Sequence, residues 1–256
     1  PHHILHWSAP PPPTPPIPVV TAPSPRIPTV DLAAESERQI VVDQQPDQYL
    51  GHVSTVLLED GRTVLAVYPK GHGAGSIILK RSSDGGLTWS QRQPVPDNWA
   101  TSKECPTIHR IIDPATGQRR LILFSGLFPC RQSTSEDDGR TWTPLAPVQT
   151  TDGIQFGGIV TMGCVERLAD GRYLALFHDD GRFFNPANGT AGKSTGTFTL
   201  YQIISSDGGR TWTPPRAIWS GSDIHLCEPG IVRSPDGKQL AILLRENRRV
   251  KNSHIM

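Results

Sequence analysis

An eight-residue pattern, S-x-D-x-G-x-T-W, occurs three times in this 256-residue chain, beginning at Ser82, Ser135 and Ser205. Its aspartate can accept hydrogen bonds from backbone N–H groups of the same turn, and its glycine permits a positive φ. Its tryptophan can bury a large ring beneath the turn. We therefore predict that these residues stabilise equivalent turns rather than carry chemistry. The aspartates and tryptophans concerned are Asp84, Trp89, Asp137, Trp142, Asp207 and Trp212.

Each copy follows a second repeated unit, in which two apolar runs flank a turn containing D-G or T-G. The turn glycines are Gly61, Gly117, Gly171 and Gly237. Two apolar runs around such a turn predict a β-hairpin. This hairpin and the hairpin that carries the eight-residue pattern make a four-stranded antiparallel unit, and radial repetition of such sheets is a β-propeller. The sequence thus predicts an all-β fold, a β-propeller of four-stranded antiparallel blades, with about four blades present.

The fourth hairpin is not followed by the eight-residue pattern. The spacing within the first three units would place a fourth copy beyond Met256. We therefore expect the last blade to be incomplete and residues 40–256 to form the N-terminal part of a longer propeller. Prolines crowd the region before Pro28, which predicts that residues 1–39 are an extended linker or tail.

Charge and cysteine content exclude several classes of function. The chain has 25 Lys and Arg against 24 Asp and Glu, so it lacks the positive charge of a nucleic-acid-binding protein. No apolar run approaches the ~20 residues of a membrane span. The four cysteines form no C-x-x-C pair, which argues against a zinc ribbon or a redox motif. They are buried thiols or, in a secreted protein, include one disulfide, for which Cys105 and Cys130 are the first candidates. We predict no metal and no cofactor, and leave the oligomeric state open.

Strand geometry selects one end of the predicted blades as the site of function. The D-G turns and the eight-residue patterns lie at one end of each blade, while the start of the first strand and the loop between the second and third strands lie at the other. Function on loops held by a scaffold is the usual arrangement. This second end collects ionisable side chains, namely His52, Lys70, His72, Glu104, Arg131, His178, Asp179, Glu228 and Arg245.

Glu228 lies at the start of one strand of a hairpin and Arg245 at the end of the facing strand. They form either a structural ion pair or a functional pair, in which Glu228 is a base and Arg245 binds an anion through two parallel hydrogen bonds. His52 is either a further donor to that anion or a core histidine. His72 lies among glycines and is either a general acid or part of a glycine-rich turn without a catalytic role. Asp179 belongs to a run with the nearest spare carboxylates, which is also ordinary turn chemistry. The remaining rim residues are expected to line a pocket.

The S-x-D-x-G-x-T-W copies resemble the Asp boxes (BNR repeats) of sialidases, also called neuraminidases, which are six-bladed β-propellers. The resemblance covers residues 40–256 and includes Cys105-Pro106-Thr107, the run 112–117, Phe156-Gly157-Gly158, and Leu226-Cys227-Glu228 with Arg245. It implies that Glu228 polarises a tyrosine nucleophile and that Arg245 is one of three arginines that bind the sialate carboxylate.

Two departures weaken the resemblance. His52 stands where the family has its first arginine, and the loop 69–75 lacks the acid/base aspartate. The third arginine and the tyrosine would lie past Met256.

The resemblance implies a secreted or periplasmic exo-glycosidase that removes terminal sialic acid or a related acidic sugar from a glycan or glycoconjugate. Glu228 is the catalytic residue that the resemblance implies, and the residues at the same end of the blades add His72 and Asp179 as further catalytic candidates. Substrate would be bound by His52, Lys70, Glu104, Arg131, His178 and Arg245. The alternatives are a hydrolase or lyase for another sugar and a non-catalytic glycan-binding propeller. The missing aspartate favours binding without catalysis, whereas the density of ionisable groups favours an enzyme.

Overall fold

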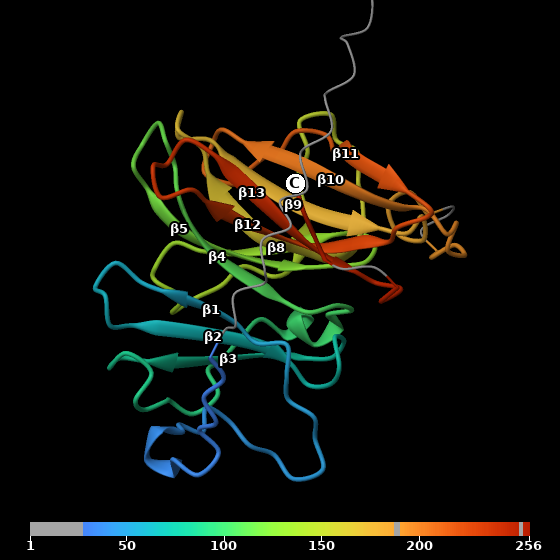
Figure 1. Cartoon of the computed structure of the whole chain (residues 1–256). Coiled ribbons are helices and arrows are strands. Elements are labelled where there is room, and N and C mark those ends of the chain that lie inside the picture. The colour runs from blue at the N-terminus through green and yellow to red at the C-terminus, as the bar shows by residue number, and fades with distance from the viewer. Residues whose placement is uncertain (1–27, 187–189, 251–252) are drawn as a thin grey trace, which may run out of the picture. The chain divides into compact units, whose positions relative to one another are not determined.

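The computed structural model describes residues 28–186, 190–250 and 253–256 of the chain (Figure 1). It divides into two units, of which the first ends at Gln39 and the second is Ile40–Met256. The described part of the first unit contains the short 3₁₀ helix η1 (Ser36–Arg38). The predicted linker or tail falls largely on residues 1–27, outside the described residues. The site lies in the second unit, which therefore carries the rest of the description.

The second unit is built of four antiparallel sheets (Figure 1). Within each sheet, neighbouring strands are consecutive in the chain. The first sheet contains β1 (Ser54–Leu57), β2 (Val64–Pro69) and β3 (Ile77–Ser82), and the second contains β4 (Thr107–Ile112), β5 (Arg119–Ser125), β6 (Arg131–Ser135) and β7 (Ala146–Pro147). The third contains β8 (Ile159–Arg167), β9 (Tyr173–Asp179), β10 (Phe198–Ser205) and β11 (Arg216–Gly221). The fourth contains β12 (Leu226–Arg233), β13 (Leu240–Glu246) and β14 (His254–Ile255). The predicted all-β fold of consecutive propeller blades is confirmed.

The first sheet has three strands, one fewer than predicted for a blade. The segment after β3 nevertheless runs beside that strand, because the N–H groups of Ser90 and Gln93 donate to the carbonyls of Arg81 and Leu79 at 2.8 Å. Two backbone hydrogen bonds between this segment and β3 therefore take the place of a regular fourth strand. The 3₁₀ helix η2 (Asp97–Thr101) then leads to the second sheet.

The four hairpin turns are those predicted from the sequence. Gly61, Gly117, Gly171 and Gly237 have φ values of 67°, 72°, 88° and 74°. Side chains disfavour this left-handed region, so glycine at these positions permits the tight return of the chain. The antiparallel pairing places these turns at one end of the sheets and the starts of β1, β4, β8 and β12 at the other.

The eight-residue turns are held by their own aspartates. In the third copy, the Ser205 hydroxyl donates to Asp207 at 2.8 Å, and the Thr211 hydroxyl donates to the same carboxylate at 2.6 Å. The same bonds recur in the first two copies. Hydrogen bonds from the Thr88 hydroxyl and backbone N–H lower the pKa of Asp84 to about 2. The carboxylate is thus ionised and engaged within its own turn.

The three tryptophans of these turns are not equivalent, contrary to the prediction that all three are buried. Trp212 has no exposed surface, whereas Trp89 and Trp142 are half-buried. The second and third turns pack on the preceding sheet, because a Cβ at Gly139 would meet Leu65 and one at Gly209 would meet Ile122. A Cβ at Gly86 in the first turn would meet only Trp89 of its own turn. No sheet precedes the first one among the described residues.

Trp142 packs against a second tryptophan, Trp99, between the first two sheets. Trp99 of η2 is fully buried and packs edge-on against Trp142, with 5.3 Å between the ring centroids. The buried aromatic position between the first two sheets therefore belongs to Trp99, which the sequence pattern does not single out.

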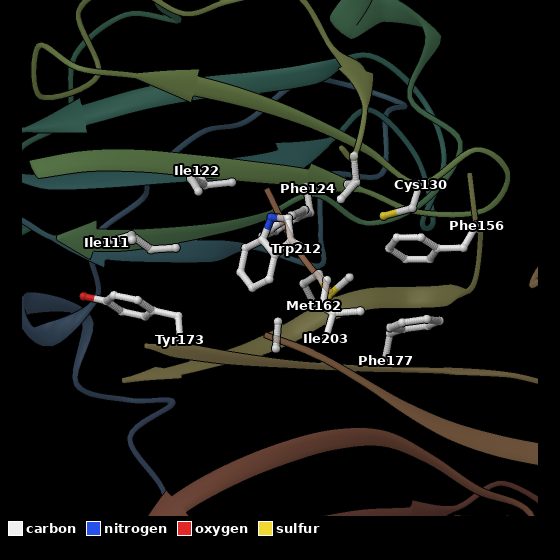
Figure 2. Close-up of a cluster of buried hydrophobic side chains, with 12 residues drawn as sticks. Ile111, Ile122, Phe124, Cys130, Phe156, Met162, Tyr173, Phe177, Ile203 and Trp212 are labelled. Carbon is white, nitrogen blue, oxygen red and sulfur yellow. The ribbon is translucent and has the colours of Figure 1, made fainter. Parts of the chain in front are cut away.

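Apolar side chains fill the space between consecutive sheets. Figure 2 shows Trp212 in the cluster between the second and third sheets. The second sheet contributes Ile111, Ile122 and Phe124, and the third contributes Met162, Tyr173, Phe177 and Ile203. The first strands of successive sheets also touch, β1 against β4, β4 against β8 and β8 against β12. This packing brings together the chain segments that lead into those strands.

Candidate functional site

A pocket of about 810 Å³ opens where the chain enters β1, β4, β8 and β12. Five of the predicted site residues lie on its walls, namely His52, His72, Glu104, Glu228 and Arg245. The walls also include Lys103, Cys105 and Arg249, which the sequence reasoning missed. Only their positions in the chain could have pointed to them. Lys103 and Cys105 are the neighbours of Glu104, and Arg249 lies four residues after Arg245.

Glu228 and Arg245 form an ion pair on the pocket wall. A Glu228 carboxylate oxygen lies 2.8 Å from Nη2 of Arg245, and the two side chains are 37% and 47% exposed. The pair joins β12 to β13, where Cys227 is the register partner of Arg245. Arg245 also donates from Nη2 to Asn247 at 2.9 Å. Both charged groups are therefore oriented and remain accessible to a ligand.

The backbone at Glu228 departs from regular strand geometry. Its φ is +50°, and the β12–β13 register shifts between Cys227 and Gly230. Non-glycine residues in this left-handed region are uncommon, and they persist where the surrounding structure holds them. A bulge here turns the Glu228 side chain toward the pocket, whose wall it helps to form.

His178 lies behind Glu228 rather than on the pocket wall. It is 3% exposed, and its Nδ1 accepts the backbone N–H of Glu228 at 3.3 Å. Burial, together with the positive charge of Arg245, lowers the pKa of His178 to about 4. The ring is therefore neutral near pH 7, as an acceptor at Nδ1 requires. His178 thus contacts the backbone of a pocket residue.

Asp179 lies outside the pocket, at the end of β9. It is 1% exposed and accepts backbone N–H bonds from Gly181, Phe183 and Phe184. Burial raises the pKa of this carboxyl, while the three N–H groups act in the opposite direction. Its contacts are those of a turn-forming aspartate at the start of the loop after β9.

Lys70 and Arg131 also lie outside the pocket lining. Lys70 takes part in an isolated bridge with Leu50. Arg131 donates to the hydroxyl and the carbonyl of Thr101, both at 2.7 Å, and so ties β6 to the end of η2. Their contacts hold loops together at this end of the sheets.

His52 and His72 meet at the edge of the pocket. Their Nε2 and Nδ1 atoms share a hydrogen bond of 3.2 Å, and their rings pack edge-on with centroids 4.4 Å apart. The ring of Tyr49 lies 5.6 Å from that of His72. Because one nitrogen must donate and the other accept, the pair constrains the tautomer of both rings.

Glu104 and Cys105 form the wall contributed by the second sheet. A carboxylate oxygen of Glu104 accepts the Cys105 N–H at 2.7 Å. Burial raises the pKa of the Cys105 thiol to about 12, and the charges of Glu104 and Glu228 act in the same direction. Glu104 and Glu228 both line the pocket. The described cysteines form no disulfide, which favours the buried-thiol alternative for Cys105.

Solved structures resemble this chain in fold. A protein of unknown function from Dyadobacter fermentans matches with a TM-score of 0.60 at 13% identity, over 84% of this chain and 67% of that one. An endo-arabinase from Bacteroides thetaiotaomicron matches with a TM-score of 0.53 at 15% identity, over 80% of this chain and 72% of that one. At these identities the likeness shows a shared fold only.

The sequence comparisons add no family. No protein-family model matches the chain, and no curated protein matches it. Within the described residues, no helix is both long and apolar enough to cross a membrane.

Proposed function

We propose that this propeller is a sugar-acting enzyme and that its active site is the pocket described above. The observation that carries the proposal is the accessible Glu228–Arg245 pair, which faces a pocket that also contains Glu104. A carboxylate that can act as a base, Glu228, and a histidine that can act as an acid, His72, lie on the same pocket wall. The likeness in fold to an endo-arabinase is in keeping with a sugar as ligand.

The sugar is proposed to be acidic, with sialic acid or a related sugar acid at the end of a glycan as the substrate. A guanidinium suits a carboxylate because its planar fork donates two parallel hydrogen bonds. The contacts of Arg245 with Glu228 and Asn247 both use Nη2. A substrate carboxylate would take its hydrogen bonds from the remaining donors. A secreted or periplasmic location follows from such a substrate and stays a prediction.

In the proposed reaction Glu228 takes the proton from a hydroxyl group, whose oxygen attacks the anomeric carbon as the bond to the leaving oxygen breaks. His72 protonates the leaving oxygen, and its hydrogen bond to His52 supplies a route by which the proton is replaced. Lys70, Arg131 and Asp179 have no direct role in this scheme, because none of them lines the pocket.

A glycan-binding protein without catalysis is the second candidate. The loop between β2 and β3, which includes Gly71, His72 and Gly73, contains no carboxylate. An enzyme whose acid is a histidine would turn over an activated aryl glycoside, whereas a binding protein would bind the same compound unchanged. Product formation therefore separates the two candidates.

The carboxylate contact is tested by Arg245→Lys, which keeps the charge and loses the fork. We expect kcat/KM on an acidic glycoside to fall by about 10- to 100-fold, the equivalent of roughly 1.5–3 kcal/mol for a charge-assisted contact. The carboxyl-reduced glycoside is the control, and its kcat/KM should change little. Equal losses on both substrates would contradict carboxylate binding and favour a structural ion pair.

His178 is proposed as a positioning residue for Glu228. His178→Leu removes the acceptor and leaves the part-buried N–H of Glu228 without its partner, so kcat should fall about tenfold with KM nearly unchanged. His178→Asn keeps an acceptor oxygen close to the position of Nδ1 and should restore most of kcat. Steady-state kinetics of both variants would reject this role if leucine and asparagine proved equally harmful.

A further inference from the structure

Beyond Arg245, the pocket carries two exposed cations that the proposed reaction does not use. Both line the pocket: Arg249 follows β13 in the chain, and Lys103 precedes β4. Lys103 donates to the carbonyl of Phe128 at 3.2 Å. Among the described residues, no carboxylate lies within ion-pair distance of either cation. On the pocket wall Lys103, Arg245 and Arg249 outnumber Glu104 and Glu228, which leaves an excess of one positive charge.

A buried carboxylate fixes the loop that carries Arg249. Glu246 is 3% exposed and accepts backbone N–H bonds from His225 and Arg248 at 3.2 Å and from Val250 at 3.0 Å. The N–H of Arg249 donates to the Glu246 carbonyl at 3.3 Å. These hydrogen bonds to Glu246 fix the backbone of the turn after β13, and with it the position of Arg249.

The same turn separates two neighbouring arginines. Arg249 has a φ of +59° and lines the pocket. Arg248 does not line it and donates to the carbonyl of Asp223 at 3.3 Å. A left-handed backbone at an arginine persists only where its surroundings hold it. The turn thus directs one guanidinium to the ligand space and its neighbour away from it.

We propose that the pocket takes an oligosaccharide with at least two carboxylates, such as linked uronic acids, with one carboxylate at Arg245 and the next at Arg249. The volume of about 810 Å³ lies toward the upper end of the range for small-molecule pockets, which leaves room for more than one sugar ring. The inference rests on the proposed function of the same pocket, and it adds a second anionic subsite.

The test compares Arg249→Gln with the matched variant Arg248→Gln by calorimetric binding. The probes are galacturonic acid, the digalacturonate disaccharide and the carboxyl-reduced disaccharide. Wild-type protein should bind the digalacturonate about tenfold or more tightly than the monosaccharide, as a second charge-assisted contact provides. Arg249→Gln should remove this advantage without changing binding of the monosaccharide, and Arg248→Gln should change neither. Thermal unfolding should be the same for both variants, because both side chains are exposed.

Three results would overturn the second subsite: no preference for the digalacturonate, the same preference in Arg249→Gln, or an equal loss in Arg248→Gln. Arg245→Lys separates this failure from that of the proposed function. If it weakens binding of galacturonic acid while Arg249→Gln changes nothing, the acidic-sugar pocket stands and the second subsite falls. If wild-type protein binds none of the three probes, the second subsite falls, and binding of sialic acid measured in the same way decides the proposed function separately.

Discussion

Replacing Glu228 with glutamine should lower kcat by about 100-fold or more, because it removes a base without changing the shape of the side chain. Stability should change by about 1 kcal/mol or less, since ion pairs between side chains as exposed as Glu228 and Arg245 contribute little. Steady-state kinetics and urea unfolding of the same variant measure the two effects separately.

Glu166→Gln is the matched control for this experiment. Glu166 pairs with Arg233 at 2.6 Å and joins β8 of the third sheet to β12 of the fourth, at the opposite end of β12 from Glu228. Its loss should leave kcat unchanged. A Glu228→Gln variant that kept its kcat and lost as much stability as Glu166→Gln would make the Glu228–Arg245 pair a structural one.

Trp212→Ala should destabilise the protein by about 3–5 kcal/mol, the usual cost of truncating a buried aromatic side chain. The ring has no exposed surface and packs edge-on against Phe124, with centroids 5.8 Å apart. Truncation would leave a cavity between the second and third sheets, where Figure 2 shows the surrounding side chains. The loss is measured as the change in the free energy of unfolding in urea.

Trp89→Ala provides the comparison, because Trp89 occupies the same position of the eight-residue pattern. Trp89 is half-buried, and its indole N–H donates to Gly86 of its own turn at 3.0 Å. Its truncation should cost about 1 kcal/mol, a typical value for a substitution outside the core. Equal losses for the two tryptophans would show that these turns act locally and do not join one sheet to the next.

The pocket shows how far sequence reasoning can reach for single residues. The starts of the first strands could be placed at one end of the sheets, and five of the nine predicted rim residues line the pocket there. His178 and Asp179 share that end but point into the protein. Which side chains reach the ligand space depends on bulges such as the one at Glu228, whose N–H is held by His178, a residue distant in the sequence. A contact of that kind leaves no local signal.

Local chemistry determined the hairpins, the glycine turns and the eight-residue turns of this protein, because each depends on residues within a few positions of one another. Tertiary packing alone decided the rest. It buried Trp212 and left Trp89 half-exposed, since only the later turn has a preceding sheet to pack on among the described residues. It also brought Arg249 to the pocket and turned Arg248 away, through a buried carboxylate that binds N–H groups from two separate segments.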